Sequence, residues 1–238
     1  HNVFGKWARP NYNSVVATFC HNIANGLPIE IDDSNRELNL IYIDDVISEF
    51  VSILLKNKAS DINQVSPVYT ITLGQLAEQI KSFHQSRVNL RLKSVGTGLT
   101  RALYATYLSY YKPDKFSYKL EQHKDDRGLF AEFLKTEDAG QVSFFTVNPG
   151  FTRGGHYHHT KSEKFLVVTG NARFRFRNIL TNEKFELEVS EDELEVIETI
   201  PGWVHDISNV GSNEMVVLLW ANEIFNQKMP DTYSDDVM

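Results

Sequence analysis

The stretch Gly150-Phe-Thr-Arg-Gly-Gly-His156-Tyr-His158-His-Thr-Lys-Ser-Glu163-Lys-Phe-Leu-Val-Val-Thr-Gly170 decides the fold of the second half of this chain. A β-strand alternates its side chains between two faces, so His156 and His158 are predicted to point the same way. Glu163 follows a short hairpin, and we expect its strand to return beside the first and to aim the carboxylate inward. A third imidazole, His205, comes later in the chain. Three imidazoles and one carboxylate predict a site for zinc or another divalent first-row metal.

Histidines in exposed loops, or in a core that satisfies their hydrogen bonds, are the ordinary alternative to a metal site. Four of the chain's eight histidines, however, lie within residues 150–170 and 201–209, and a carboxylate accompanies them. Clustered His and Glu side chains of this kind indicate a metal or catalytic centre. We therefore predict that a divalent metal, with zinc as the expected ion, is bound by His156, His158, Glu163 and His205.

The composition limits the classes of function. The chain has 238 residues, enough for one large or two ordinary domains, and 42% of them are hydrophobic. No apolar run approaches the roughly 20 residues that span a bilayer, and the start lacks a signal-peptide pattern. The single Cys20 excludes an intrachain disulfide and predicts a reducing, cytoplasmic location. A net charge of −7 without a basic run argues against nucleic acid as a partner.

Residues 1–114 are predicted to be a mixed α/β region. Residues 11–25 carry apolar side chains at helical spacing, and Gly26 ends that helix. A strand is predicted over 37–43, followed by a helix capped by Asp44. That helix is expected to bury an apolar face formed by Val46, Ile47, Phe50, Val51 and Leu54.

Two further helices complete the predicted first half. Thr72 and Gln75 form a capping-box pattern ahead of a helix that buries Leu76, Ile80 and Phe83. A Tyr-rich helix is predicted over residues 99–111. The sequence Lys112-Pro113-Asp114 breaks it, and we place the domain boundary there.

Residues 115–238 change character, because helical periodicity gives way to short alternating or β-branched runs separated by turn signals. The runs cover residues 141–147, 164–169, 172–177, 185–189, 194–199 and 215–220. This spacing is typical of an all-β sandwich or barrel. The predicted fold class is therefore an α+β chain in two parts, a partial α/β region followed by an all-β barrel.

The pattern Gly-x5-His-x-His-x4-Glu-x6-Gly, followed by Pro-Gly-x2-His-x3-Asn, resembles the two motifs of the cupin superfamily. The first motif matches throughout, from Gly150 to Gly170. The second keeps its core from Pro201 to Asn209, but Glu195 stands where the family has a leading Gly. The resemblance implies a jelly-roll barrel over residues 115–238 that binds metal through the same four side chains. Because cupins host many chemistries, the fold alone assigns no reaction.

Two segments narrow the reaction. Residues 125–132 and Arg153-Gly-Gly-His156 are similar to the first strands of nucleotide-sugar epimerases and ketoisomerases built on cupin barrels. The resemblance implies proton removal next to a keto group, with a base at the carbon and the divalent metal as electrophile at the carbonyl oxygen. It also implies that Arg153 contacts the substrate.

The sequence does not identify the base that removes this proton. Metal-free relatives place a Lys near position 163, but Glu163 occupies that inward position here, and Lys164 is one residue out of phase. The candidates near the predicted ligands are Tyr157, His159, Lys161 and Asp206. Each of them is also compatible with a surface or supporting role.

Asn2-Val-Phe-Gly5 and residues 36–46 resemble the later half of extended short-chain dehydrogenase/reductases that act on nucleotide sugars. The resemblance implies that Asn2 touches the substrate and that Arg36 binds its diphosphate. The chain lacks the Gly-rich dinucleotide fingerprint and a Tyr-x-x-x-Lys pair ahead of Asn2, so we expect no NADPH site in it. Because the chain does not begin with Met, we interpret it as a piece of a longer protein whose reductase part is truncated and inactive.

A reductase half joined to a cupin is similar, over the whole chain, to bifunctional enzymes of capsular polysaccharide synthesis. That resemblance implies C3 epimerisation of a UDP-2-acetamido-2,6-dideoxy-4-keto-hexose by the cupin. In the full-length enzyme, NADPH then reduces C4 to give UDP-N-acetyl-6-deoxy-L-talosamine. We also expect a homodimer through the strand edges of the barrel.

Two alternatives to the epimerase interpretation stay open. One is a metal-dependent cupin oxygenase or isomerase of another small molecule, with iron bound by the same ligands. The other is a non-catalytic module that binds a sugar nucleotide or mediates dimerisation. Metal analysis with oxygen-uptake assays separates the first from an epimerase, and hydrogen exchange at C3 separates the second.

Overall fold

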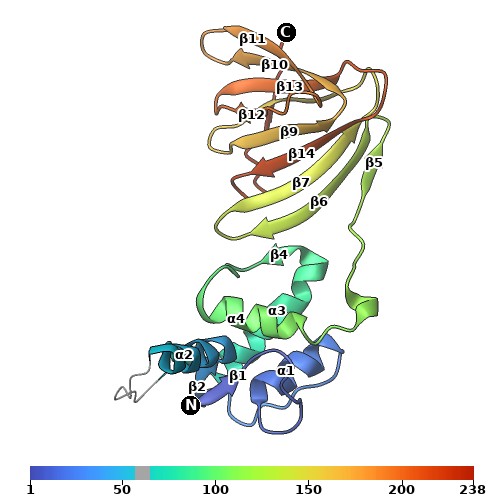
Figure 1. Cartoon of the computed structure of the whole chain (residues 1–238). Coiled ribbons are helices and arrows are strands. Elements are labelled where there is room, and N and C mark those ends of the chain that lie inside the picture. The colour runs from blue at the N-terminus through green and yellow to red at the C-terminus, as the bar shows by residue number, and fades with distance from the viewer. Residues whose placement is uncertain (57–64) are drawn as a thin grey trace. The chain divides into compact units, whose positions relative to one another are not determined.

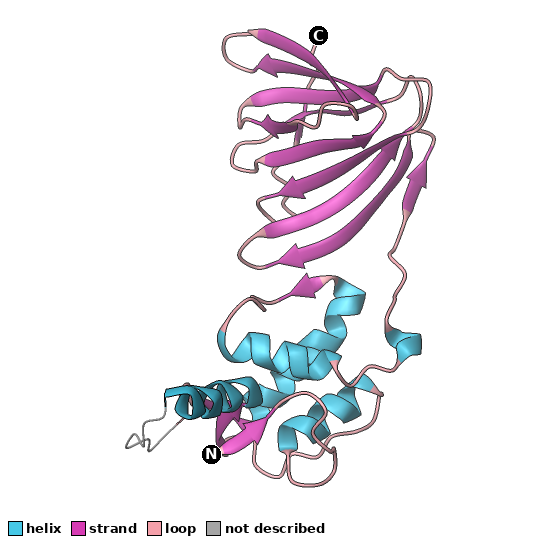
Figure 2. Ribbon diagram, viewed as in Figure 1, coloured by secondary structure: helices cyan, strands magenta, loops and turns pink. Residues whose placement is uncertain are grey.

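The computed structural model describes residues 1–56 and 65–238 and divides the chain into two compact units, His1–Tyr118 and Lys119–Met238 (Figure 1). Helices dominate the first unit and strands dominate the second (Figure 2). The boundary predicted after residue 114 falls shortly before the division in the structure. Among the described residues, no helix is long and apolar enough to cross a membrane.

In the residues that the structure describes, the first unit combines a small sheet with four helices. Its elements are β1 (Asn2–Phe4), α1 (Val15–Ala24), β2 (Glu37–Tyr42), α2 (Ile43–Lys56), β3 (Tyr69–Thr72), α3 (Leu73–Asn89), β4 (Arg91–Leu92), α4 (Gly98–Leu108) and the 3-10 turn η1 (Pro113–Lys115). Strand β2 lies between β1 and β3, parallel to β1 and antiparallel to β3. Helices α1, α3 and α4 pack on one another around a shared core.

Local signals in the sequence account for the starts of two helices. The Ser14 hydroxyl accepts a hydrogen bond from the N–H of Ala17 at the start of α1. Thr72 and Gln75 form the predicted capping box, in which each side chain accepts from the other residue's backbone N–H. The apolar residues that follow in α3, Leu76, Ile80 and Phe83, are buried as predicted.

The predicted burial of the α2 apolar face is wrong. Val46 is half-buried, but the rest of the face is exposed. The exposed side chains are Ile47, Phe50, Val51 and Leu54, and 77% of the Leu54 surface is accessible to solvent. The predicted cap is also wrong, because α2 begins at Ile43 and Asp44 lies in its first turn, where it pairs with Lys6 Nζ at 3.2 Å. Helical periodicity identifies an apolar face but does not specify which segment covers it.

The second unit consists of two antiparallel sheets. Its strands are β5 (His123–Asp125), β6 (Gly128–Thr136), β7 (Gly140–Val147), β8 (Thr152–Tyr157), β9 (Glu163–Thr169), β10 (Asn171–Asn178), β11 (Lys184–Ser190), β12 (Val196–Thr199), β13 (Trp203–Asn209), β14 (Met215–Ala221) and β15 (Tyr233–Ser234). One sheet has the order β11-β10-β13-β8-β15. The other has the order β12-β9-β14-β7-β6, with β5 also paired to β6.

The inner faces of both sheets share one apolar core, to which β7, β9, β10, β13 and β14 contribute. Strand β10 shows the alternation clearly, since Phe174 and Phe176 are buried in this core. Arg173, the residue before Phe174, points outward and pairs with Glu188 at 2.7 Å. Period-two alternation therefore sets which side chains reach the interior between the sheets.

The six strands predicted in this half are present as β7, β9, β10, β11, β12 and β14, with ends shifted by one or two residues. The predicted hairpin, however, is wrong. Strand β8, which carries His156, pairs with β13 and β15, whereas β9, which begins at Glu163, pairs with β12 and β14 in the other sheet. The carboxylate therefore reaches the imidazoles across the interior rather than along one sheet.

Candidate metal centre

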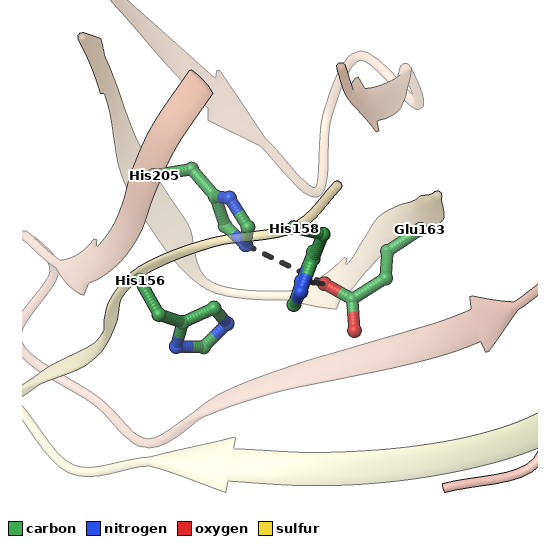
Figure 3. A group of neighbouring side chains, drawn as sticks. All are labelled: His156, His158, Glu163 and His205. Carbon is green, nitrogen blue, oxygen red and sulfur yellow. Dashed lines mark hydrogen bonds and ion pairs between the residues drawn. The ribbon is translucent and has the colours of Figure 1, made fainter. Parts of the chain in front are cut away.

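Four side chains, three from strands and one from the residue just after a strand, meet in the interior of the second unit (Figure 3). His156 lies in β8, His158 directly follows β8, Glu163 begins β9 and His205 lies in β13. Each offers one ligand atom, and these atoms lie within 4.8 Å of one another. The structure thus brings together the four residues that the sequence proposed as ligands. Their binding of a metal stays a prediction.

Two local features place His156 beside His205. The two residues are register partners in the β8–β13 pair, and the register shifts between His205 and Asp206. Gly154 adopts a φ of 103°, and a Cβ there would lie only 2.7 Å from the His205 carbonyl oxygen. Glycine permits both the positive φ and this close backbone approach. The Gly-Gly pair ahead of His156 therefore lets β8 run close enough to β13.

Backbone carbonyl groups orient two of the rings. His158 Nδ1 lies 2.5 Å from the Asp231 carbonyl oxygen, and His205 Nδ1 lies 3.4 Å from the Trp203 carbonyl oxygen. A carbonyl oxygen can only accept, so in the neutral rings each Nδ1 carries the proton and each Nε2 keeps its lone pair. The two Nε2 atoms face Glu163 Oε2 at 3.2 and 3.4 Å.

The cluster is buried and rich in lone pairs. His158, Glu163 and His205 are 2%, 6% and 3% exposed, and His205 Nε2 has no hydrogen-bond partner among the described residues. Burial lowers the pKa of His156 to about 4 and keeps that ring neutral. Burial opposes ionisation of Glu163, but the positive charge of Lys161, 3.1 Å away, helps to hold the pKa of this carboxyl well below its usual range. Neutral imidazoles and an ionised carboxylate are the metal-binding forms.

The donor set fits a divalent cation. Lone pairs that face one another in a buried space repel unless a proton or a cation lies between them, and the partnerless Nε2 of His205 points to such a cation. Three imidazole nitrogens and one carboxylate oxygen suit zinc and other first-row metals. The donor atoms alone do not distinguish among these ions.

The cluster borders two cavities. The smaller cavity, about 120 Å³, is mainly apolar, with Phe145, Phe165 and Phe174 in its wall. The larger cavity, about 290 Å³, is lined by Phe130, Glu132, His156, Lys161, Glu163 and Thr232, among others. His156 and Glu163 line both, so a molecule in either cavity lies beside the cluster.

Two of the four candidate bases, Tyr157 and His159, pack their rings against Tyr233. Tyr157 stacks on Tyr233 with ring centres 5.4 Å apart, and the ring of His159 lies edge-on to Tyr233 at 4.8 Å. Asp206, the third candidate, borders the smaller cavity, but both of its oxygens accept hydrogen bonds from Arg175, at 3.0 and 2.5 Å.

Lys161 is the candidate base that lies at the larger cavity. Its side chain is 10% exposed, and Nζ lies 3.1 Å from Glu163 Oε1. Nζ also lies 3.4 Å from the Thr232 hydroxyl. Lys161 therefore contacts a predicted ligand, Glu163, and also lines the larger cavity.

The predicted substrate contacts lie in both units. Arg153 borders the smaller cavity, with its guanidinium carbon 5.7 Å from the centre of the Phe145 ring. Asn2 lies in β1 of the first unit, and Arg36, in the same unit, pairs with Asp32 at 3.2 Å. The substrate-binding roles of Asn2, Arg36 and Arg153 stay predictions.

Sequence reasoning missed two acidic residues near the cluster. Glu132 lines the larger cavity together with Phe130, and this spacing of two residues, which puts both on one face of a strand, is the signal that could have found it. Asp231 contacts the segment between His158 and Glu163, yet it lies 73 residues beyond His158. No local pattern connects residues at that separation.

Comparisons with known proteins place this chain in a family. Residues 123–233 match a family model described as the polysaccharide biosynthesis C-terminal domain. The chain is 56% identical over 237 residues to a Pseudomonas aeruginosa protein named UDP-2-acetamido-2,6-beta-L-arabino-hexul-4-ose reductase, covering 99% of this chain and 64% of that protein. It matches a crystal structure of the capsular polysaccharide assembling protein CapF from Staphylococcus aureus with a TM-score of 0.93 and 44% identity, over 99% of this chain and 69% of that chain. The chain belongs to the CapF family.

A second CapF crystal structure, described as CapF with the inhibitor 3-isopropenyl-tropolone, matches with the same TM-score and identity. The chain spans less than two thirds of the length of the P. aeruginosa reductase. The family-model match lies within the second unit, which also contains the His–Glu cluster. The matched polysaccharide biosynthesis domain and the cluster therefore lie in the same part of the chain.

Proposed function

We propose that the second unit epimerises C3 of a UDP-2-acetamido-2,6-dideoxy-4-keto-hexose during synthesis of a capsular polysaccharide precursor. The observation that carries the proposal is the buried His–Glu cluster beside a cavity of about 290 Å³. The P. aeruginosa relative is named for a 4-keto sugar nucleotide, which supports the substrate class. In a full-length enzyme, NADPH would then reduce C4 to give UDP-N-acetyl-6-deoxy-L-talosamine.

Epimerisation beside a ketone moves a proton and involves no net oxidation. A basic side chain takes the C3 proton, and the electron pair of the C3–H bond delocalises onto the C4 oxygen. An acidic group then returns a proton to C3 from the opposite face. A divalent cation, for which zinc is our choice, would be held by His156, His158, Glu163 and His205 and would supply a Lewis acid at that oxygen. The step needs no nicotinamide, which agrees with the lack of a dinucleotide fingerprint in this sequence.

The chain's own residues position the sugar and move the proton. The larger cavity is near the lower limit of ordinary ligand pockets, so it suits one sugar ring rather than a whole nucleotide sugar. His156 and Glu163 would place the cluster beside that ring, and Phe130 would exclude water from one side. We assign the return of a proton to C3 to Lys161, because its ammonium group borders the same cavity and pairs with Glu163.

Deuterium incorporation tests this function directly. The chain, loaded with zinc and given the UDP-4-keto sugar in deuterated water without NADPH, should exchange the C3 proton, as followed by NMR. The chelated chain should exchange far more slowly. Unchanged C3 protons in the presence of bound metal would overturn the epimerase proposal and favour a binding module, and iron-dependent oxygen uptake would favour an oxygenase.

The tropolone named in the CapF structure offers a second probe. Its ring carries two adjacent oxygens, an arrangement that chelates divalent cations. We expect 3-isopropenyl-tropolone to slow C3 exchange and to bind the zinc-loaded chain but not the chelated chain. Equal binding to both forms would contradict a role for the cation in that inhibition.

A further inference from the structure

The last residues of the chain form a strap over the candidate metal centre. We use "strap" for residues 231–237. Its strand β15 pairs antiparallel with β8, so that Ser234 lies opposite His156. Val237, near the end, is buried. The strap is thus part of the packed unit and lies directly beside a strand that carries a predicted ligand.

Contacts away from the cluster fix the far end of the strap. The N–H of Asp235 donates to the Gly155 carbonyl oxygen at 3.1 Å. The Asp235 carboxylate pairs with Arg177 at 2.8 Å, and Arg177 also donates to the Asp236 carbonyl oxygen at 2.8 Å. These contacts hold the strap without touching the segment between His158 and Glu163.

Asp231, at the near end, contacts that segment with its main chain and its side chain. Its carbonyl oxygen lies 2.5 Å from His158 Nδ1. Its carboxylate accepts hydrogen bonds from the backbone N–H groups of His159, Thr160 and Lys161, at 2.9, 2.7 and 2.8 Å. The Thr160 hydroxyl adds a fourth bond at 3.0 Å. One residue therefore holds the whole turn between two predicted ligands.

We propose that Asp231 is a positioning residue of the metal centre. Its carbonyl fixes the proton of His158 on Nδ1, and its carboxylate fixes the turn that sets the distance from His158 to Glu163. The inference rests on the proposed function, because it takes the cluster to bind a divalent cation. It adds a residue that neither the sequence motifs nor the donor set indicates.

The physical reason is preorganisation of the ligands. A neutral imidazole binds metal through the nitrogen that lacks a proton, so a carbonyl at Nδ1 selects the form whose Nε2 faces Glu163 at 3.2 Å. The turn from residue 159 to 162 would otherwise sample several conformations, and each would separate His158 from Glu163. Partners of metal-binding histidines commonly change metal affinity by about 10–100-fold when removed.

A matched pair of variants separates positioning from general support. Asp231→Ala removes the carboxylate that accepts three backbone N–H hydrogen bonds. Asp235→Ala removes a carboxylate of the same strap that pairs with Arg177. Competition with a chelator should show a zinc dissociation constant raised about 10–100-fold in Asp231→Ala. In Asp235→Ala it should change by less than about threefold. Asp231→Asn retains one acceptor oxygen and should fall between Asp231→Ala and the wild type.

Two spectroscopic readouts do not depend on catalysis. Cobalt bound in place of zinc should give altered visible absorption bands in Asp231→Ala and unaltered bands in Asp235→Ala. In the metal-free wild type, long-range hydrogen–nitrogen NMR should place the His158 proton on Nδ1. Asp231→Ala keeps the carbonyl oxygen of residue 231 but no longer ties the turn after His158 to the strap. The ring should therefore lose its fixed partner and shift toward a mixture of the two tautomers.

The outcomes distinguish this inference from the proposed function. Unchanged zinc affinity and an unchanged His158 tautomer in Asp231→Ala would overturn the positioning role, even if the wild type catalyses exchange. Equal losses in Asp231→Ala and Asp235→Ala would also overturn it, since both would then reflect loss of the strap. A wild type that binds zinc but exchanges no C3 proton would refute the epimerase, while an affinity loss specific to Asp231→Ala would still support the positioning role.

Discussion

Replacement of His205 by Ala tests the cluster as a metal site, because it removes one of four donors. His205 Nε2 lies 3.4 Å from Glu163 Oε2 and has no hydrogen-bond partner among the described residues, so the cation would be its main polar contact. Four-ligand zinc sites provide about 10–16 kcal/mol of apparent binding free energy. One quarter of that, about 2.5–4 kcal/mol, corresponds to a dissociation constant raised by about 60–700-fold.

The assay is competition for zinc between the purified chain and a chromophoric chelator at fixed pH. Thermal unfolding with and without zinc gives an independent value, because a ligand stabilises the folded state according to its concentration relative to its dissociation constant. His123→Ala is the matched control, since His123 is an exposed histidine of β5 outside the cluster. Wild-type affinity in His205→Ala, or an equal loss in His123→Ala, would refute the assignment of His205 as a ligand.

Three further predictions follow from the site. Gly154→Ala should lower the free energy of unfolding by about 2 kcal/mol or more and weaken zinc binding, because a Cβ would meet the β13 backbone at 2.7 Å. Gly150 also has a positive φ but has open space around it, so Gly150→Ala should lower the stability less. Thermal unfolding measures both losses. In the metal-free chain, the free energy of unfolding should fall as the pH drops from 6.5 to about 4. The pKa of His156 is lower in the folded state, so the unfolded state binds more protons in this range. Urea titrations should show a loss of up to about 3 kcal/mol in the wild type and a smaller loss in His156→Gln. Lys161→Met should slow C3 exchange by about 100-fold or more while changing zinc affinity less than His205→Ala does, and unchanged exchange would remove Lys161 from the mechanism.

The ligand set could be predicted from sequence because it depends on short-range geometry. Alternation along a strand puts His156 and His158 on one side, and the structure places both in the cluster. The strand pairing of Glu163 could not be predicted in the same way. A short connection can return beside the preceding strand or cross to the opposite sheet, and both paths turn the first side chain inward. The sequence pattern is the same for the two cases.

Contacts between distant segments explain the remaining differences. The α2 pattern correctly marks an apolar face, but burial depends on a covering segment, and Leu54 stays exposed. Asp206 looked available beside His205, yet it is the register partner of Arg175, which occupies its carboxylate. Asp231 reaches His158 from the end of the chain. Such partners follow from strand order, which local periodicity does not contain.

Anomalous X-ray scattering from crystals of the chain loaded with zinc tests the central claim most directly. We predict one strong peak in the second unit, at about 2.0–2.2 Å from the ring nitrogens of His156, His158 and His205 and from a carboxylate oxygen of Glu163. Density for these four side chains without a peak among them, or a peak bound only elsewhere, would contradict a shared cation.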